Sequence, residues 1–380
     1  MSETTSETAV APTLREATEH QPAARVALEA AAAAPRHAYL FVGPRGTGKR
    51  DAARAFSAEI LATGAPDPDD ARRRALAWPS PHPDLVWLTP PGTQHLVEEV
   101  RERVIRGAAY RPFEGERRVF VIEAAEAMGD ESQNALLKTL EEPPAFAHLL
   151  LLSSEPATLL ETVISRCQPV RFAPLPPRAV EERLASAPLE APEAERRAAA
   201  RLCGGDAERA LFLLTEPGRE LRSRAEACAR AARSNRLGDA PWLALLDTAE
   251  RAGKEAATET MARVAEREAM LRGERARRSR EPEEAGRRAG RRRRVEVLDL
   301  GLAICGAWFR DLAAIGEGAA ELAVNADREA ELRDDAEGLD PRAARRAAEL
   351  VLDTQRRLRV HVSEELALEA LFYRAASALP

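Results

Sequence analysis

Short apolar runs separated by helical patterns dominate the first half of the chain. Residues 119–122 and 149–152 are apolar throughout with no polar alternation, which is typical of strands buried on both faces of a parallel sheet. Similar short runs occupy residues 39–42, 84–88 and 169–172. Because helical patterns lie between these runs, the chain predicts an α/β domain with a mostly parallel sheet.

The segment between the two central runs predicts a helix with clear ends. Asp130 lies three residues before Gln133, a capping-box arrangement that favours a helix start at Asp130. Pro143 and Pro144 end the helix, because proline has no N–H to donate and pushes the preceding residue out of the α region. Further helices are predicted over residues 14–34, 51–62, 93–109 and 158–164, whereas residues 65–82 form a loop or small insertion and residues 1–13 a disordered tail.

The pattern changes after Phe172. Pro174, Pro176 and Pro177 mark a linker, and alanine, leucine, glutamate and arginine then recur at helical spacing with almost no strand signal. This predicts an all-α region, divided near residue 219 into a small helical lid, residues 174–218, and a larger C-terminal bundle, residues 219–380.

Residues 272–294 are the unusual passage of that helical region. They contain eleven arginines against four glutamates. Such a run can be a solvated, flexible loop or an anion-binding patch that contacts DNA. We expect a loop, and the DNA contact stays open as an alternative.

Composition limits the classes of function that the protein can have. A formal net charge of -6, with 45% hydrophobic and 31% charged residues, predicts a soluble globular protein and not a generally basic nucleic-acid binder. No two of the four cysteines form a CxxC pair. Their wide spacing indicates buried thiols in a reducing compartment. No apolar stretch is long enough for a membrane span, and the polar, acidic N-terminus is unlike a secretion signal, so we expect a cytoplasmic protein without membrane contact.

A glycine loop follows the strand at residues 39–42. Its sequence, GPRGTGKR, places Gly43, Gly46, Gly48 and Lys49 in a GxxxxGK pattern that can hold phosphates at a helix N-terminus. Arg50 stands where a nucleotide hydrolase needs Ser or Thr to bind Mg²⁺, and it has no oxygen ligand. ATP or ADP binding without hydrolysis is one reading, and a turn that holds no ligand is the other.

The strand at residues 119–122 bears on the same chemistry. Hydrolases of this type end that strand in an acidic pair, one residue for Mg²⁺ and one to orient the attacking water. Here the pair reads Glu123 and Ala124, and Ala124 cannot polarise water. Glu126 is near in sequence but lies on the following turn. A second part of the hydrolytic apparatus is therefore missing.

Arg166, within Ser165-Arg166-Cys167, is the one remaining candidate for chemistry. It follows an apolar helix and precedes a strand, which predicts a place at an edge of the domain. A guanidinium supplied to a neighbouring subunit can stabilise charge on a γ-phosphate. From its position alone, an ordinary surface arginine is the simpler reading.

These motifs together carry a resemblance to a known family. GPRGTGK, HPDLVWL at residues 82–88, NALLKTLEEPP at residues 134–144 and the SRC tripeptide resemble the delta prime subunits of the bacterial DNA polymerase III clamp loader, within the AAA+ superfamily. The resemblance covers residues 14–172, with weaker similarity near residues 204–211 and 362–371. NALLKTLEEPP followed by SRC is its most specific part.

The resemblance implies three domains: an AAA+ α/β domain at residues 14–173, a helical lid, and a C-terminal collar that holds a ring of subunits together. It implies a stator without ATPase activity of its own, within a DNA polymerase holoenzyme that loads the sliding clamp onto primed DNA. The expected partners are the tau/gamma and delta subunits, with primer-template DNA and the clamp reached through the complex. Arg166 would act in trans as an arginine finger.

Two other functions stay open beside this resemblance, and the sequence differs from many relatives at one place. A tau/gamma-like ATP-hydrolysing motor would have to tolerate Arg50, and a DNA-binding adaptor would use residues 272–294. Many relatives carry a four-cysteine zinc module before the HPD strand, but residues 64–81 contain no cysteine. We therefore expect no zinc and no other bound metal, and an insertion that holds its shape by other means or is mobile.

Overall fold

The computed structural model of the chain describes residues 12–77, 80–90, 94–187, 189–272, 281–358 and 362–379. The chain divides into two compact units, Met1–Leu175 and Pro176–Pro380. This boundary lies close to the predicted linker after Phe172. The finer division of the second half at residue 219 stays a prediction, because a single compact unit contains both parts.

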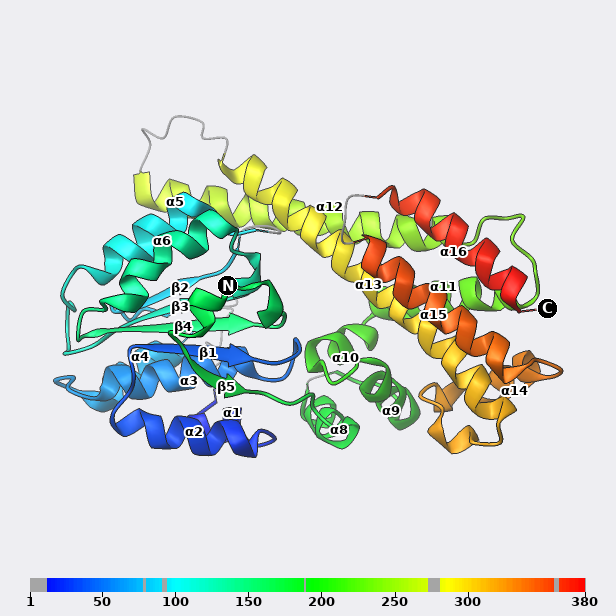
Figure 1. Cartoon of the computed structure of the whole chain (residues 1–380), viewed down its shortest axis with the longest axis horizontal. Coiled ribbons are helices and arrows are strands. Elements are labelled where there is room, and N and C mark those ends of the chain that lie inside the picture. The colour runs from blue at the N-terminus through cyan, green and yellow to red at the C-terminus, as the bar shows by residue number, and fades with distance from the viewer. Residues whose placement is uncertain are drawn as a thin grey trace, which may run out of the picture. The chain divides into compact units, whose positions relative to one another are not determined.

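Unit 1 is an α/β domain (Figure 1). Its strands are β1 (Ala38–Val42), β2 (Leu85–Leu88), β3 (Arg118–Ile122), β4 (Ala147–Ser153) and β5 (Gln168–Arg171). Its helices are α1 (Leu14–Ala17), α2 (Pro22–Ala33), α3 (Lys49–Ala62), α4 (Pro68–Leu76), α5 (Val97–Glu99), α6 (Asp130–Glu141) and α7 (Glu161–Ile164). A π-helical segment, η1 (Val100–Arg106), continues α5, and 3-10 turns occupy η2 (Ala125–Ala127) and η3 (Pro156–Thr158).

The five strands form one parallel sheet in the order β2-β3-β4-β1-β5. β3 and β4 are buried along their whole length, as their continuous apolar sequences predict. All five predicted strands are therefore confirmed, and so is the parallel α/β fold. β1 pairs with β4 on one side and β5 on the other, which brings the ends of β1, β3 and β4 to one edge of the sheet.

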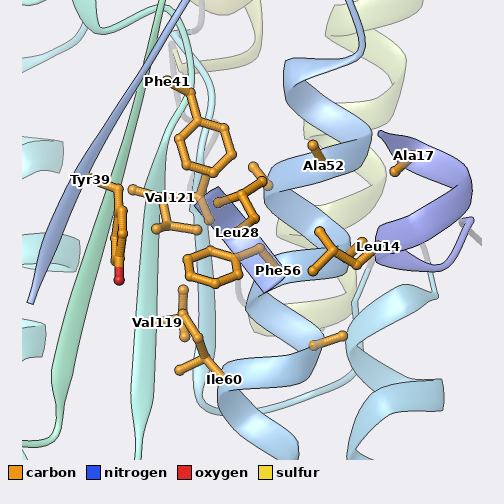
Figure 2. Close-up of a cluster of buried hydrophobic side chains, with 14 of the residues drawn as sticks. Leu14, Ala17, Leu28, Tyr39, Phe41, Ala52, Phe56, Ile60, Val119 and Val121 are labelled. Carbon is orange, nitrogen blue, oxygen red and sulfur yellow. The ribbon is translucent and has the colours of Figure 1, made fainter. Parts of the chain in front are cut away.

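Helices cover both faces of this sheet (Figure 1). On one face α3 packs against the strands, and Figure 2 shows Phe56 and Ile60 of α3 facing Tyr39, Val119 and Val121. The Tyr39 and Phe56 rings meet edge to face with centroids 5.1 Å apart. The alternate strand residues form a second core with α6 and η1 on the other face. The alternation of side chains along each strand thus feeds two cores.

Several local predictions in unit 1 are corrected by the structure. α6 begins at Asp130 as predicted, but its N-cap is Gly129, and the predicted capping box does not form because the Gln133 side-chain amide donates to Met128 O and accepts from Leu160 N. The helix predicted from residue 93 begins at Val97. The predicted loop at residues 65–82 contains helix α4, which the side chain of Asp67 caps.

Residues 1–11 of the predicted tail, residues 1–13, lie outside the described residues. Thr13, however, forms a capping box with Glu16 at the start of α1, so it belongs to the structured unit. A break at residues 18–21 divides the helix predicted over residues 14–34 into α1 and α2.

In the part of the chain that the structure describes, unit 2 consists of helices joined by turns and loops and has no strand. Its helices are α8 (Pro177–Ser186), α9 (Glu193–Leu202), α10 (Ala207–Leu213), α11 (Glu216–Arg233), α12 (Trp242–Arg272), α13 (Glu281–Gly316), α14 (Glu329–Ala336), α15 (Pro341–Leu358) and α16 (Glu364–Ala378), with 3-10 turns η5 (Ala320–Leu322) and η6 (Ala326–Arg328). This confirms the all-α prediction. None of the described helices combines the length and apolarity needed to cross a membrane.

The arginine-rich passage is corrected in part. Residues 273–280 lie outside the described residues, but residues 281–294 are the first turns of α13 and not a loop. Arginines of this stretch have partners: Arg292 pairs with Glu296 and Arg294 with Glu364, and Arg293 stacks over the Phe212 ring. These three arginines therefore make contacts within unit 2.

Candidate functional site

The candidate residues of the glycine loop gather at the carboxyl edge of the sheet. Gly43 follows β1, Glu123 follows β3 and Ser154 follows β4. The N–H of Gly43 donates to Ser153 O at 3.2 Å, which ties the start of the loop to the end of β4. Ligands of open α/β sheets bind at this edge, where the strand order reverses.

Glycine is required in the loop by space and by backbone conformation. A Cβ on Gly43 would lie 2.2 Å from the carbonyl oxygen of Phe172. Gly46 and Gly48 have φ of 66° and 89°, in the left-handed region that favours glycine. Gly48 is the N-cap of α3, so Lys49 is its first residue. The loop therefore turns tightly into a helix N-terminus, as a phosphate-binding loop does.

Lys49 bends back over the loop. Its Nζ donates to Gly43 O at 2.6 Å and to Pro44 O at 2.5 Å. Behind the loop, the buried amide of Gln21 donates to Thr47 O at 3.2 Å and to Ala173 O at 2.7 Å, and accepts from Ala173 N at 2.8 Å. Gln21 thus joins the loop to the segment after β5.

Arg50 lies beside Glu123. The Arg50 Nε is 3.7 Å from the Glu123 Oε2, and the Arg50 side chain is 40% exposed. The same Oε2 accepts hydrogen bonds from Trp87 Nε1 and Thr89 Oγ1, both at 3.1 Å. Arg54, one turn after Arg50, stacks over the Trp87 ring with its guanidinium carbon 5.7 Å from the centroid. Burial lowers the pKa of Arg54 from its usual value, and the nearby Arg50 charge lowers it further.

Ala124 holds a strained conformation, with φ 51° and ψ 57°, at the start of the turn η2. The ring of His95 supports this turn, because its Nε2 donates to Glu123 O at 2.7 Å. Glu126 faces Ser154, accepting from its Oγ at 2.5 Å and from its backbone N–H at 3.3 Å. Glu126 thus anchors the turn to the end of β4 and does not replace the missing acid at position 124.

Arg166 lies apart from the glycine loop. It follows α7, and its side chain is 35% exposed. Its Nη2 donates to Glu141 Oε1 at 2.6 Å, and its Nη1 donates to Thr162 O at 2.9 Å. Glu141 is the last residue of α6, so the ion pair joins the NALLKTLEEPP and SRC motifs. The sequence did not predict this pairing.

The residues do not fit the Mg²⁺ that the fold family implies. Arg50 has no oxygen to offer, and its charge already accompanies the Glu123 carboxylate. Among the described residues, no group of three or more His, Cys, Asp and Glu side chains could hold a metal ion. No step of a metal-assisted hydrolysis can be assigned to these side chains.

The cysteine-free insertion is held together by ion pairs. Arg72 of α4 reaches Glu59 of α3 at 3.1 Å, and Arg74 pairs with both Asp70 and Glu114. Ala71 and Ala75 bury the inner face of the helix. Within the described residues, these ion pairs and buried alanines hold the insertion in shape without cysteines.

The structure brings together Gly43, Gly46, Gly48, Lys49, Arg50 and Glu123, and it leaves Arg166 elsewhere in unit 1. The sequence did not point to Trp87, Thr89 and His95, which surround Glu123. The pairing of β2 with β3 brings side chains of the β2 end beside Glu123, and the sequence pattern does not reveal which strands pair.

Comparison with known proteins agrees with this geometry. Residues 20–176 match the protein-family model described as DNA polymerase III, delta subunit. Residues 20–176 are similar to this family. The resemblance seen in the motifs is thereby confirmed for this part of the chain.

Individual relatives match the same domain. DNA polymerase III subunit delta' of Bacillus subtilis is 35% identical over 153 residues, which are 39% of this chain and 45% of that protein. DNA polymerase III subunit tau of Bacillus subtilis is 32% identical over 150 residues, 39% of this chain and 26% of that protein. The match thus spans less than half of either relative.

A solved DNA polymerase III gamma subunit-related protein from Thermotoga maritima aligns over 93% of this chain and 99% of its own, at 14% identity and a TM-score of 0.42.

Proposed function

We propose that the chain is a clamp-loader subunit of DNA polymerase III that does not hydrolyse ATP and acts as a stator within an AAA+ ring. The observation that carries this proposal is the family match of residues 20–176 combined with Arg50 and Ala124 at the two positions where hydrolysis needs an oxygen ligand and an acid. Its partners would be tau/gamma and delta subunits. Contact with the clamp and with primer-template DNA would come through the assembled complex in the cytoplasm.

Within the ring, Arg166 would serve the nucleotide site of a neighbouring subunit. Its guanidinium is partly exposed and its partner Glu141 is 49% exposed, so their ion pair contributes no more than about 1 kcal/mol. A γ-phosphate carries more charge than one carboxylate and would displace Glu141. Glu141 would hold the finger in place until a neighbour with nucleotide arrives.

The test is ATP turnover by a loader reconstituted with this subunit. Arg166→Ala should lower the turnover of the complex, because an arginine finger contributes roughly 10³ to 10⁵ in rate at the site that it completes. Assembly, measured by size-exclusion chromatography, should not change. Arg101→Ala, which removes another partly exposed arginine paired with a glutamate, is the matched control. Unchanged turnover in the Arg166→Ala loader would remove the finger assignment.

The rival function, an ATP-hydrolysing motor, is favoured by Lys49 and by the match to a tau subunit. The chain assayed alone separates the two. Appreciable Mg²⁺-dependent ATP hydrolysis that Lys49→Ala abolishes would contradict the stator proposal. A DNA-binding adaptor would instead show DNA affinity that falls steeply with salt and is lost when residues 272–294 are deleted.

A further inference from the structure

The glycine loop has the shape of a phosphate site but lacks the surroundings of a divalent cation. Gly46 and Gly48 give it the left-handed conformations of a phosphate-binding loop, and Lys49 opens the following helix. Arg50 occupies the position of the metal-binding hydroxyl.

Glu123 is already provided with partners. One oxygen, Oε2, accepts from Trp87 and Thr89 at 3.1 Å and lies 3.7 Å from the Arg50 Nε. A dication placed beside this carboxylate would face the Arg50 charge within a few ångströms, and the repulsion is costly at a partly buried site. Arg50 therefore gives Glu123 the counter-charge that a metal would otherwise supply.

The charges near the loop favour an anion. Lys49, Arg50 and Arg54 contribute three positive charges along the first turns of α3, whereas Asp51 and Glu123 contribute two negative ones. A nucleotide without Mg²⁺ carries more negative charge than its metal complex. The excess of cations in the loop compensates that charge without a metal.

We propose that the Arg50 guanidinium replaces the divalent cation in this phosphate loop, so that a nucleoside di- or triphosphate binds here as a metal-free anion. Lys49 and the loop N–H groups hold the phosphates, and Arg50 faces them from the side where other phosphate loops keep a metal ion. The inference does not rest on the proposed function, because a stator can form with or without nucleotide.

The experiment titrates the purified full-length chain with a fluorescent N-methylanthraniloyl-ADP, once with EDTA and once with MgCl₂. The wild type should bind more tightly in EDTA than in MgCl₂, because Mg²⁺ complexes the nucleotide and withdraws the metal-free anion. Arg50→Ala should weaken binding in EDTA about tenfold or more, because a charge-assisted contact is lost. Arg50→Lys should restore part of it, and Lys49→Ala should abolish binding in both buffers.

Arg73→Ala is the matched control, since Arg73 is an exposed arginine of α4 paired with Asp70. It should bind like the wild type, and circular dichroism should show every variant folded. The proposal is overturned by binding that requires Mg²⁺, by no binding in either buffer, or by an Arg50→Ala affinity equal to the wild type. Each of these outcomes leaves the loader-turnover and size-exclusion tests of the stator function untouched.

Discussion

Burial sets the chemistry of several single residues. Asp84, which is fully buried, accepts hydrogen bonds from the backbone N–H groups of Phe113 and Glu114 and lies 3.8 Å from Arg118. The aspartate of the HPD motif therefore holds the loop before β3. Phe113 itself is 72% exposed, and Arg118 lies against its ring at 5.1 Å. One buried carboxylate thus organises a loop whose aromatic residue faces solvent.

The four cysteine thiols should be inert in the folded protein. All are buried, and burial raises the pKa of Cys167 and of Cys228 to about 12 and raises that of Cys203 and of Cys305 as well. Native protein at pH 8 should release almost no thionitrobenzoate from Ellman's reagent, and urea should expose all four thiols. Fast reaction of any cysteine in native protein would contradict the burial.

Three buried histidines should make unit 1 less stable at mildly acidic pH. Burial is the main cause that lowers the pKa of His82, of His95 and of His148 below the ordinary 6.5. The unfolded chain then binds more protons than the folded one below pH 6.5, so the free energy of unfolding falls as the pH falls, by at most about 1.4 kcal/mol per pH unit for each histidine.

Urea unfolding followed between pH 7 and pH 5 measures this dependence, and NMR titration of the imidazole protons assigns it. The three imidazoles should titrate below pH 6.5. His95→Gln should reduce the pH dependence, provided the variant folds. A free energy of unfolding that stays level over this range would contradict the prediction.

Two helices of unit 2 cross at unusually short range. Gly253 of α12 faces Gly290 of α13, and a Cβ on Gly290 would lie 2.7 Å from Gly253 O. A Cβ on Gly253 would lie 2.8 Å from Gly290 O. Gly286 lies on the same face, where a Cβ would be 2.8 Å from Ala257 O. The glycines of the arginine-rich stretch thus allow α12 and α13 to pack closely.

Gly290→Ala should destabilise unit 2 although alanine favours helix by about 1 kcal/mol. The new methyl group would meet a backbone oxygen that cannot rotate away, at a net cost of about 1–3 kcal/mol. Gly238→Ala is the control, because nothing lies within 4 Å of its Cβ position. Chemical denaturation of both variants measures the difference, and equal stability would mean that the two helices do not approach so closely.

The whole molecule consists of two units with separate cores. Unit 1, Met1–Leu175, contains both sheet cores and the complete candidate site. A domain of this size can bury a core of its own. The family match, residues 20–176, ends at nearly the same place.

Residues 1–175 expressed alone should therefore fold and unfold cooperatively. Circular dichroism during thermal unfolding should show one sigmoidal transition, and the fragment should retain the buried thiol of Cys167. A gradual, non-cooperative loss of signal would show that the first unit depends on Pro176–Pro380.

The sequence alone determined the strands, the parallel sheet, the helical second half and the two non-permissive positions Arg50 and Ala124. Continuous apolar runs and glycine or proline breaks are local signals, so they can be recognised without knowing what lies nearby in space. Tertiary structure decided the rest. Arg50 meets Glu123 only because β3 lies two strands from β1 in the sheet, and Arg166 meets Glu141 only because α6 and α7 pack together. Such pairings join residues far apart in the chain, and the fold alone brings them within reach. The glycine loop that looked like a degenerate hydrolase site therefore contains an arginine beside the Glu123 carboxylate.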